Sequence, residues 1–287
     1  MPTLFEAEPD NVFVSSKQLP MIFPQLPKLL PLRRFLKRQP RIVSLVRALR
    51  SVWWLGPWQS LLVKHHQRRN QNPALPRNPS SLFAELNARK TVADLNQAGY
   101  AHGIQLPESQ INQIVEFCGQ QDACANPHLH CQTVHQIAHD PKLLEVVKGY
   151  FGTEPVLYSS SLYWTWPPLT EEKHQQALAL KSKFHYDVGD FKTLIVFIYL
   201  TDVDESSGPH VVIAGTHKQK TLMRLLTRYL NDSVAYAEFS DRINVITGQR
   251  GAGFFEDLTC YHKHSVGQKA RLMLTICYLL QRKPLNA

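Results

Sequence analysis

The stretch "FHYDVGDFKTLIVFIYLTDVDESSGPHVVIAGTHK", residues 184–218, carries the strongest pattern in the chain. It opens with His185 and Asp187, and continues with an apolar run, an acidic turn and Gly-Thr-His. Side chains two residues apart point to the same face of a β-strand, so an imidazole and a carboxylate would project into one cavity. They are either two metal ligands or two polar residues beside a buried strand. The spacing alone does not decide between these interpretations, because His-x-Asp is a common pattern.

The sequence before Gly152 is typical of helices, and the sequence after it is typical of strands. Before it, one helix is predicted to end at Gly99, a second to start at Pro107, and a third to start at Pro141 with Asp140 as N-cap. Runs rich in β-branched and aromatic residues then predict strands. They are "EPVLYSSSLYWTWPP", "TLIVFIYLTDV", "HVVIAG" and "RLMLTICYLL". This order predicts an α+β domain whose strands form a sandwich or barrel.

The positive charge lies in the N-terminal part of the chain. Residues 11–84 contain 13 Lys and Arg and no Asp or Glu, whereas residues 85–287 contain 19 basic and 20 acidic residues. The net charge of +9 therefore belongs to a basic extension, predicted over 1–81, that precedes a nearly neutral domain over 82–287. The end of this extension, residues 65–81, is rich in Asn, Pro and Ser and predicts a linker. A neutral main domain gives no indication of a nucleic-acid groove.

A basic amphipathic helix is predicted in this extension over 41–55, ending at Gly56-Pro57. Arg47 and Arg50 lie opposite the apolar face. That face consists of Ile42, Leu45, Val46, Leu49, Val52 and Trp53. Two interpretations stay open: the helix lies on an anionic membrane surface, with peripheral contact through residues 33–58, or it packs its apolar face on the main domain.

Cysteine usage favours a reducing compartment. The chain has five cysteines, an odd number with wide spacing, and no pattern of a secretory signal at its beginning. No run of 18 apolar residues is present, so no membrane span is expected. We therefore expect a cytoplasmic protein, with membrane association through the basic helix as an added alternative.

A second polar group lies downstream, in "GAGFFEDLTCYHKHSVGQKARLMLTICYLL", residues 251–280. It supplies His262 and His264, and then Arg271 at the start of an apolar strand. A buried arginine is costly unless it is paired, and a dicarboxylate ligand would pair it in a bidentate way. Two histidines and one carboxylate form the facial triad that holds Fe(II) and leaves positions open.

Together these blocks resemble the phytanoyl-CoA dioxygenase family of Fe(II)/2-oxoglutarate oxygenases, over roughly residues 82–280. The resemblance rests on the 184–218 block and on three further stretches. They are "DLNQAGYAHGIQLPESQINQIVEF", "HDPKLLEVVKGYFGTEPVLYSSSLYW" and "FFEDLTCYHKHSVGQKAR". It implies a double-stranded β-helix, or jelly roll, flanked by helices. It also implies the cofactor Fe(II) and the cosubstrates 2-oxoglutarate and dioxygen.

The resemblance also assigns metal ligands. It carries over His185 and Asp187 as iron ligands and His262 as the distal ligand. His264 stands where the family usually has glycine and is the alternative third ligand, because it would face the same way on a strand. Halogenases related to this family have a small residue in place of the carboxylate. Retention of Asp187 therefore favours hydroxylation.

The same resemblance assigns Arg271 as the partner of the distal carboxylate of 2-oxoglutarate. Thr193 and Tyr163 are further candidates for that pocket, because both are predicted on strands next to the site. The expected activity is hydroxylation, or oxidative demodification, of an aliphatic C–H bond in a small metabolite such as a natural product or an amino-acid derivative.

A carboxylate-bearing substrate is favoured by the positive groups His264, Lys192 and Lys263. Two alternatives stay open. One is a non-catalytic binding or membrane-associated module on the same fold. The other is a hydrolytic metal site, in which Arg271 would have no role.

Overall fold

The computed structural model describes residues 48–49, 51–69, 80–181, 183–218 and 220–280. The predictions for residues 33–47, and the centre of the predicted linker at 70–79, lie outside these ranges. The described residues belong to one compact unit that begins at Ala48.

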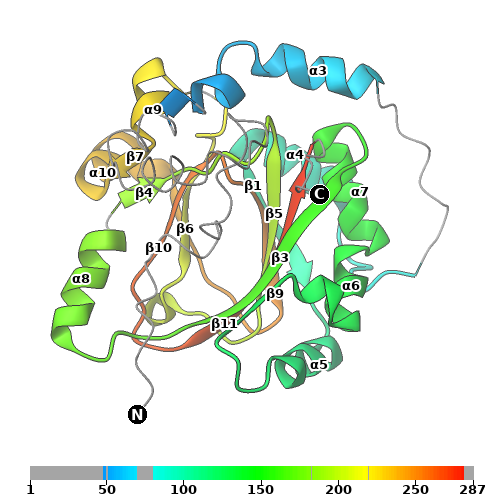
Figure 1. Ribbon diagram of the computed structural model, residues 1–287, viewed down its shortest axis with the longest axis vertical. Coiled ribbons are helices and arrows are strands. Elements are labelled where there is room, and N and C mark those ends of the chain that lie inside the picture. The colour runs from blue at the N-terminus through cyan, green and yellow to red at the C-terminus, as the bar shows by residue number, and fades with distance from the viewer. Residues whose placement is uncertain (1–47, 50, 70–79, 182, 219, 281–287) are drawn as a thin grey trace, which may run out of the picture. The chain divides into compact units, whose positions relative to one another are not determined.

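Two antiparallel sheets form the core of this unit (Figure 1). The larger sheet has the order β1-β9-β5-β11-β3-β2. Its strands are β1 (Tyr100–Gln105), β2 (Ala123–Ala125), β3 (Val156–Thr165), β5 (Thr193–Tyr199), β9 (Ala252–Asp257) and β11 (Arg271–Leu279). The smaller sheet has the order β7-β4-β10-β6-β8. Its strands are β4 (Lys183–His185), β6 (His210–Ile213), β7 (Tyr229–Asn231), β8 (Ile243–Ile246) and β10 (Tyr261–His264).

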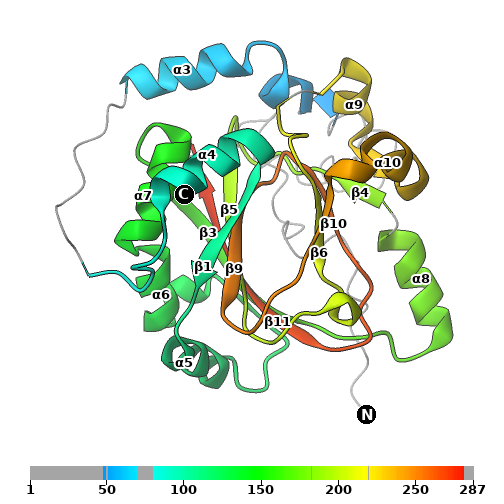
Figure 2. The ribbon, with the colours of Figure 1, turned by 180° about the vertical axis from the view of Figure 1, so that it is seen from behind.

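Helices cover the outer face of the larger sheet, as Figures 1 and 2 show from opposite sides. They are α4 (Ala88–Ala98), α5 (Glu108–Cys118), α6 (Gln132–Ala138) and α7 (Pro141–Phe151). The predicted boundaries are confirmed, because α4 ends at a left-handed Gly99 and Asp140 caps α7 by accepting hydrogen bonds from Lys142 and Leu143. The remaining helices are α3 (Gln59–Arg69), α8 (Glu171–Lys181), α9 (Leu222–Thr227) and α10 (Asp232–Phe239), with short 3-10 turns at Pro127–Leu129, Glu205–Ser207 and Ser240–Arg242.

The central strands β5 and β11 are buried along their whole length. Alternate residues of each, such as Leu194 and Leu272, join the core beneath the helices. The others, such as Phe197 and Arg271, face the space between the two sheets. The ring of Phe197, for example, lies 4.9 Å from that of His210 on the smaller sheet. This arrangement of facing antiparallel sheets with helices on one side fits the predicted jelly roll.

The described part of the N-terminal segment contacts this core. Residues 48–49 and 51–55 are helical, and α3 follows. The ring of Trp54 lies 4.4 Å from that of Phe191, and Gln59 donates a hydrogen bond to the Phe191 carbonyl. Gln67 donates another to Phe151, so the linker predicted from His65 onward is wrong as far as Arg69.

Of the two interpretations left open for the amphipathic helix, packing of its apolar face on the main domain is wrong at Leu49 and Trp53. Leu49 and Trp53, which belong to the predicted apolar face, are exposed. The side that packs inward carries Ala48 and Ser51 instead. Among the described helices, none combines the length and apolar character that crossing a bilayer requires.

Candidate functional site

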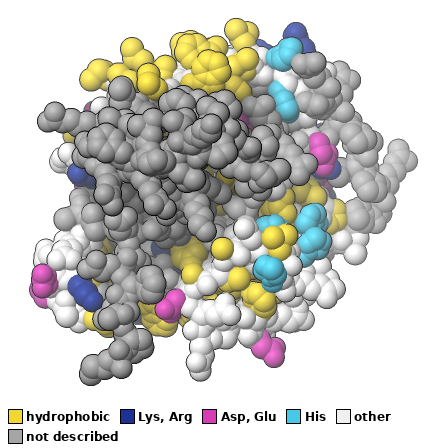
Figure 3. Space-filling model, viewed as in Figure 1, with side chains coloured by type: hydrophobic (Ala, Val, Ile, Leu, Met, Phe, Trp, Pro, Cys, Tyr) yellow, Lys and Arg dark blue, Asp and Glu magenta, His cyan; other side chains and the backbone are white. Residues whose placement is uncertain are grey.

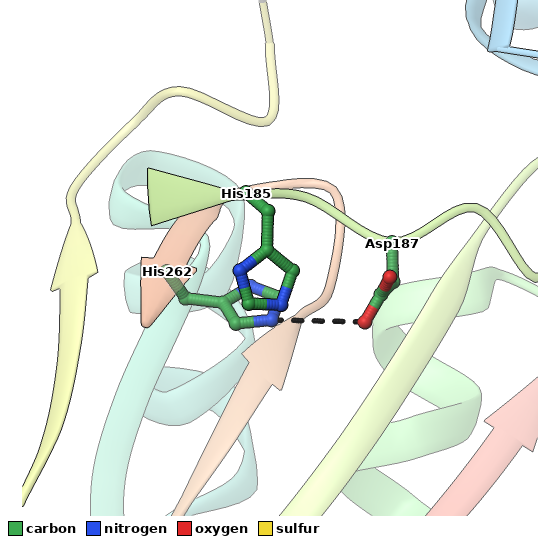
Figure 4. Close-up of side chains that lie close together, drawn as sticks. All are labelled: His185, Asp187 and His262. Atoms are coloured by element: carbon green, nitrogen blue, oxygen red, sulfur yellow. Dashed lines mark ion pairs between the residues drawn. The ribbon is translucent and has the colours of Figure 1, made fainter. Parts of the chain in front are cut away.

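His185, Asp187 and His262 converge at one end of the space between the sheets (Figure 4). His185 is the last residue of β4, and it pairs directly with His262 of β10. Asp187 follows in a loop, held by a hydrogen bond from its backbone N–H to the Leu258 carbonyl. One ligand atom from each side chain lies within 4.8 Å of the other two. The prediction that the two side chains lie together is confirmed, but the strand geometry behind it is wrong. The strand ends at His185, and the loop that follows brings the carboxylate of Asp187 toward the histidines.

His264 lies on the same strand as His262 but contacts a different group. Both face the space between the sheets, as the alternation of β10 requires. The Nδ1 atom of His264 is 2.9 Å from Nη2 of Arg271. The three-residue cluster among the described residues contains His262 and not His264.

The tautomer of His262 follows from its surroundings. Its Nδ1 lies 3.1 Å from the carbonyl oxygen of Cys260, which can only accept a hydrogen bond. Nδ1 therefore carries the proton, and the unprotonated Nε2 faces Asp187, whose Oδ2 is 3.8 Å away. Burial lowers the pKa of His262 to about 4, so the imidazole is neutral at physiological pH. A neutral imidazole with a free Nε2 suits a metal ligand.

Glu256 stands behind His262 in the interior. Its Oε1 is 3.3 Å from Nδ1 of His262, and its Oε2 is 2.5 Å from Nε2 of His210. Burial raises the pKa of Glu256 to about 8 and lowers that of His210 well below its usual range. Both shifts favour uncharged partners, so Glu256 joins the larger sheet to two histidines of the smaller sheet without a net charge.

Arg228 fixes the carboxylate of Asp187. Its Nη2 lies 3.0 Å from Oδ1 of Asp187, and it also donates to the carbonyl of Tyr186. Arg228 ends α9 with φ of +56°, a left-handed conformation that costs free energy in a residue other than glycine. The contact occupies Oδ1 and leaves Oδ2 facing the histidines.

Arg271 is buried at the start of β11, inside the space between the sheets. Its Nε and Nη1 have no hydrogen-bond partner among the described residues, and neither does the hydroxyl of Tyr163. Arg271 pairs with Thr165 on the neighbouring strand β3, and Tyr163 lies two residues from Thr165 on that strand. Burial lowers the pKa of Arg271 and raises that of Tyr163. Unpartnered buried donors are costly, so this pair of groups fits an anionic ligand such as a carboxylate.

Thr193 does not lie with Arg271. It pairs with Leu279, at the opposite end of β11. Eight residues of strand separate it from Arg271, or roughly 26 Å at 3.3 Å per residue. Its hydroxyl is close to Gly189, since a Cβ built there would lie 2.8 Å from it. The expectation that Thr193 shares the pocket of Arg271 is therefore not supported by its position.

The positive groups invoked for a carboxylate-bearing substrate each contact another residue. The Nζ of Lys263 lies 2.6 Å from Asp232, and that of Lys192 donates to the carbonyl of Tyr150. His264 contacts Arg271. The structure thus leaves that expectation without its supporting residues.

Arg228, Glu256 and His210 were not identified from the sequence. Arg228 and Asp187 are 41 residues apart, and Glu256 lies on a strand whose local pattern gives no chemical signal. His210 follows Gly-Pro in the acidic turn, where a polar residue is expected to be exposed to solvent. Only the register of the two sheets brings these groups to the metal cluster.

No protein-family model matches the chain, and no curated protein matches it either. Solved structures do match. SnoN, described as an epimerase in complex with Fe3+, alpha ketoglutarate and nogalamycin RO, is 13% identical with a TM-score of 0.52, covering 70% of this chain and 91% of that one. Apo HygX from Streptomyces hygroscopicus is 12% identical with a TM-score of 0.51, covering 67% and 86%. At this identity the likeness establishes the fold.

Proposed function

We propose that the chain is an Fe(II)- and 2-oxoglutarate-dependent oxygenase like those of the phytanoyl-CoA dioxygenase family, and that it hydroxylates an aliphatic C–H bond of a small metabolite. One observation carries this proposal. The His185–Asp187–His262 cluster and a buried arginine with unpartnered nitrogens lie in the same space between two sheets. A hydrolytic metal site would give Arg271 no role.

The donor set fits Fe(II). Two imidazoles and one carboxylate form the facial arrangement that non-haem Fe(II) oxygenases use, with the remaining positions open for other ligands. In this proposal His185, Asp187 and Nε2 of His262 would hold the ion. Arg228 keeps Asp187 in place through Oδ1, and the Cys260 carbonyl with Glu256 keeps His262 in the required tautomer.

The pocket beside the cluster fits the distal carboxylate of 2-oxoglutarate. His264, two residues beyond His262 on β10, contacts Arg271, so the guanidinium lies next to the strand of the proposed distal ligand. Arg271 then donates from Nε and Nη1, and Tyr163 donates from its hydroxyl. Bound together, Fe(II), 2-oxoglutarate and dioxygen supply oxidative decarboxylation to succinate and CO2, with one oxygen atom inserted into a C–H bond of the substrate.

The test is succinate formation by the full chain with Fe(II), 2-oxoglutarate and air, first alone and then with a panel of small metabolites. Wild type should release succinate, and a metabolite that binds productively should speed its release and gain one oxygen atom by mass spectrometry. Asp187→Ala is the matched inactive control. Normal Fe(II) binding with no succinate across the panel would instead identify a non-catalytic binding module.

A further inference from the structure

Large apolar side chains are exposed on three neighbouring helical segments. Figure 3 shows hydrophobic side chains gathered at the top of the view, over α9, residues 48–49 and 51–55, and the start of α3 as Figure 1 places them. The exposed fractions of these residues are 53% for Leu49, 59% for Trp53, 68% for Leu61, 62% for Leu222 and 68% for Met223. We call these five residues the apolar surface. Isolated exposed apolar residues are normal, but a group of this size marks an interaction site.

The three segments are joined beneath this surface. The hydroxyl of Tyr186 donates to the carbonyls of Arg224 and Leu225 in α9 and hydrogen-bonds the side chain of Ser51. Trp58, at the turn into α3, donates from Nε1 to the carbonyl of Trp53. The apolar surface is thus anchored on the domain by its inner side and presents only its outer side.

Basic residues lie next to the apolar surface on α3. Lys64 and Arg68 are exposed and lie three and seven residues after Leu61, so the three side chains share one face of the helix. In Figure 3, Lys or Arg and His side chains lie at the α3 end of the apolar group. No acidic residue occurs between Asn11 and Ala84. On α9, Arg224 is paired with Glu238 and adds little net charge.

We propose that the apolar surface, with Lys64 and Arg68, docks on an anionic phospholipid bilayer. Protruding Trp and Leu side chains beside Lys and Arg are the composition that binds at a lipid interface, where rings and aliphatic chains enter the headgroup layer and cations meet anionic lipids. A protein partner is less well matched, since the acid-free stretch offers one sign of charge and no complementary pairs. This proposal stands independently of the proposed chemistry.

Docking in this way places the membrane close to the candidate metal site. Tyr186, which holds both α9 and Ser51, lies between His185 and Asp187 in the chain. Trp54 and Gln59 contact Phe191 in the loop that follows Asp187. One layer of helix therefore separates the bilayer from the loop that supplies Asp187 and follows His185.

The experiment is co-sedimentation of the full-length protein with vesicles of phosphatidylcholine alone and of phosphatidylcholine with phosphatidylserine. Wild type should bind the anionic vesicles and should dissociate from them as the salt concentration is raised. The Trp53→Ser/Leu61→Ser variant should lose about tenfold or more in partitioning, because two large apolar side chains leave the interface. Lys64→Ser/Arg68→Ser should lose about tenfold on anionic vesicles and little on neutral ones.

The chain offers a matched control in Trp166→Ser/Leu169→Ser, which removes the same side-chain types from positions 57% and 86% exposed elsewhere. This control should bind within twofold of wild type, and circular dichroism should show all variants folded. The proposal is overturned if wild type ignores anionic vesicles, or if the Trp53/Leu61 variant binds like its control, which would assign binding to the basic N-terminal residues alone. Light scattering gives a further outcome that would overturn the proposal. If wild type is a dimer that does not bind vesicles, and the Trp53→Ser/Leu61→Ser variant is a monomer, the surface binds a second copy of the chain.

Discussion

Glu256 lies 3.3 Å from the protonated ring nitrogen of His262, on the side of the imidazole that faces away from Asp187. The carboxyl comes from the larger sheet and the histidine from the smaller one, so their contact joins the two sheets behind the proposed distal ligand. Removing such outer partners of a metal-bound histidine typically costs about 10- to 100-fold in metal affinity.

Glu256→Ala should therefore weaken Fe(II) binding by about 10- to 100-fold, while Glu256→Gln, which keeps an oxygen acceptor of the same size, should restore most of the affinity. Titration with Fe(II) under anaerobic conditions measures both variants. A purely structural role would lower thermal stability in both and leave the affinity of the folded fraction unchanged. Equal affinity in Glu256→Ala and wild type would show that the Cys260 carbonyl alone orients His262.

Substitution of the two histidines of β10 should affect two different binding steps. His262→Ala, like His185→Ala, should abolish Fe(II) binding, because each removes one of three proposed ligands. His264→Ala should keep Fe(II) binding and weaken 2-oxoglutarate, because His264 contacts Arg271 and not the cluster. Metal titration and 2-oxoglutarate titration on the same samples distinguish the two. Loss of metal binding in His264→Ala with retention in His262→Ala would reverse the assignment.

Features with local signals were predictable from the sequence. Asp140-Pro141 and Gly152 bound α7 through capping chemistry that acts within one turn, and β5 and β11 are predominantly apolar because both faces of each strand are buried. These signals need no knowledge of distant residues. They establish α4, α5 and α7 and the central strands, whereas α3, α6, α8, α9 and α10 were not predicted.

Features set by register were not predictable in the same way. The sequence places Thr193 on a strand next to the site and so predicts that it shares the pocket of Arg271, yet antiparallel pairing of β5 with β11 puts Thr193 and Arg271 at opposite ends. The contact of Arg228 with Asp187 depends on a left-handed residue at the end of α9. The apolar face of the N-terminal helix was readable, but whether it met protein or solvent was decided by packing against Tyr186 and Phe191.

The pocket of Arg271 gives a graded prediction. Arg271→Ala should weaken 2-oxoglutarate binding by about 100-fold, the scale of losing a charge-assisted bidentate pair, and Arg271→Lys should recover part of it. Tyr163→Phe removes one neutral donor and should cost about fivefold. Anaerobic titration of the Fe(II) protein with 2-oxoglutarate gives these values, with Fe(II) affinity unchanged in all three variants.

Thr193→Val is the matching test of register. Its hydroxyl lies far along β11 from Arg271, so the variant should bind 2-oxoglutarate within twofold of wild type if the distal carboxylate sits at Arg271. A loss as large as that of Tyr163→Phe would mean that the keto acid extends toward Gly189. The assignment of Arg271 as the carboxylate partner would then be wrong.

Lys220 provides a pH-dependent stability prediction. It lies over the rings of Tyr186 and Tyr261 and donates to the carbonyls of Thr216 and Thr259. Burial lowers its pKa to about 8 in the folded protein, whereas an exposed lysine titrates near 10.4. Between these two values the unfolded chain binds more protons than the folded one. The free energy of unfolding therefore rises with pH across that window, and below pH 8 the cost of the buried charge is constant.

Wild type should consequently gain stability relative to Lys220→Met between pH 7.5 and pH 9.5, by up to about 2 kcal/mol at 1.36 kcal/mol per pKa unit. Urea unfolding of both proteins at the two pH values measures this difference, and the comparison cancels the titration of tyrosines and cysteines that the two share. Lys218→Met, at an exposed position two residues away, is the control. Wild type should gain no stability relative to Lys218→Met between the two pH values. Parallel pH profiles for wild type and Lys220→Met would show that Lys220 remains charged across the window, held by the two carbonyls and the two rings.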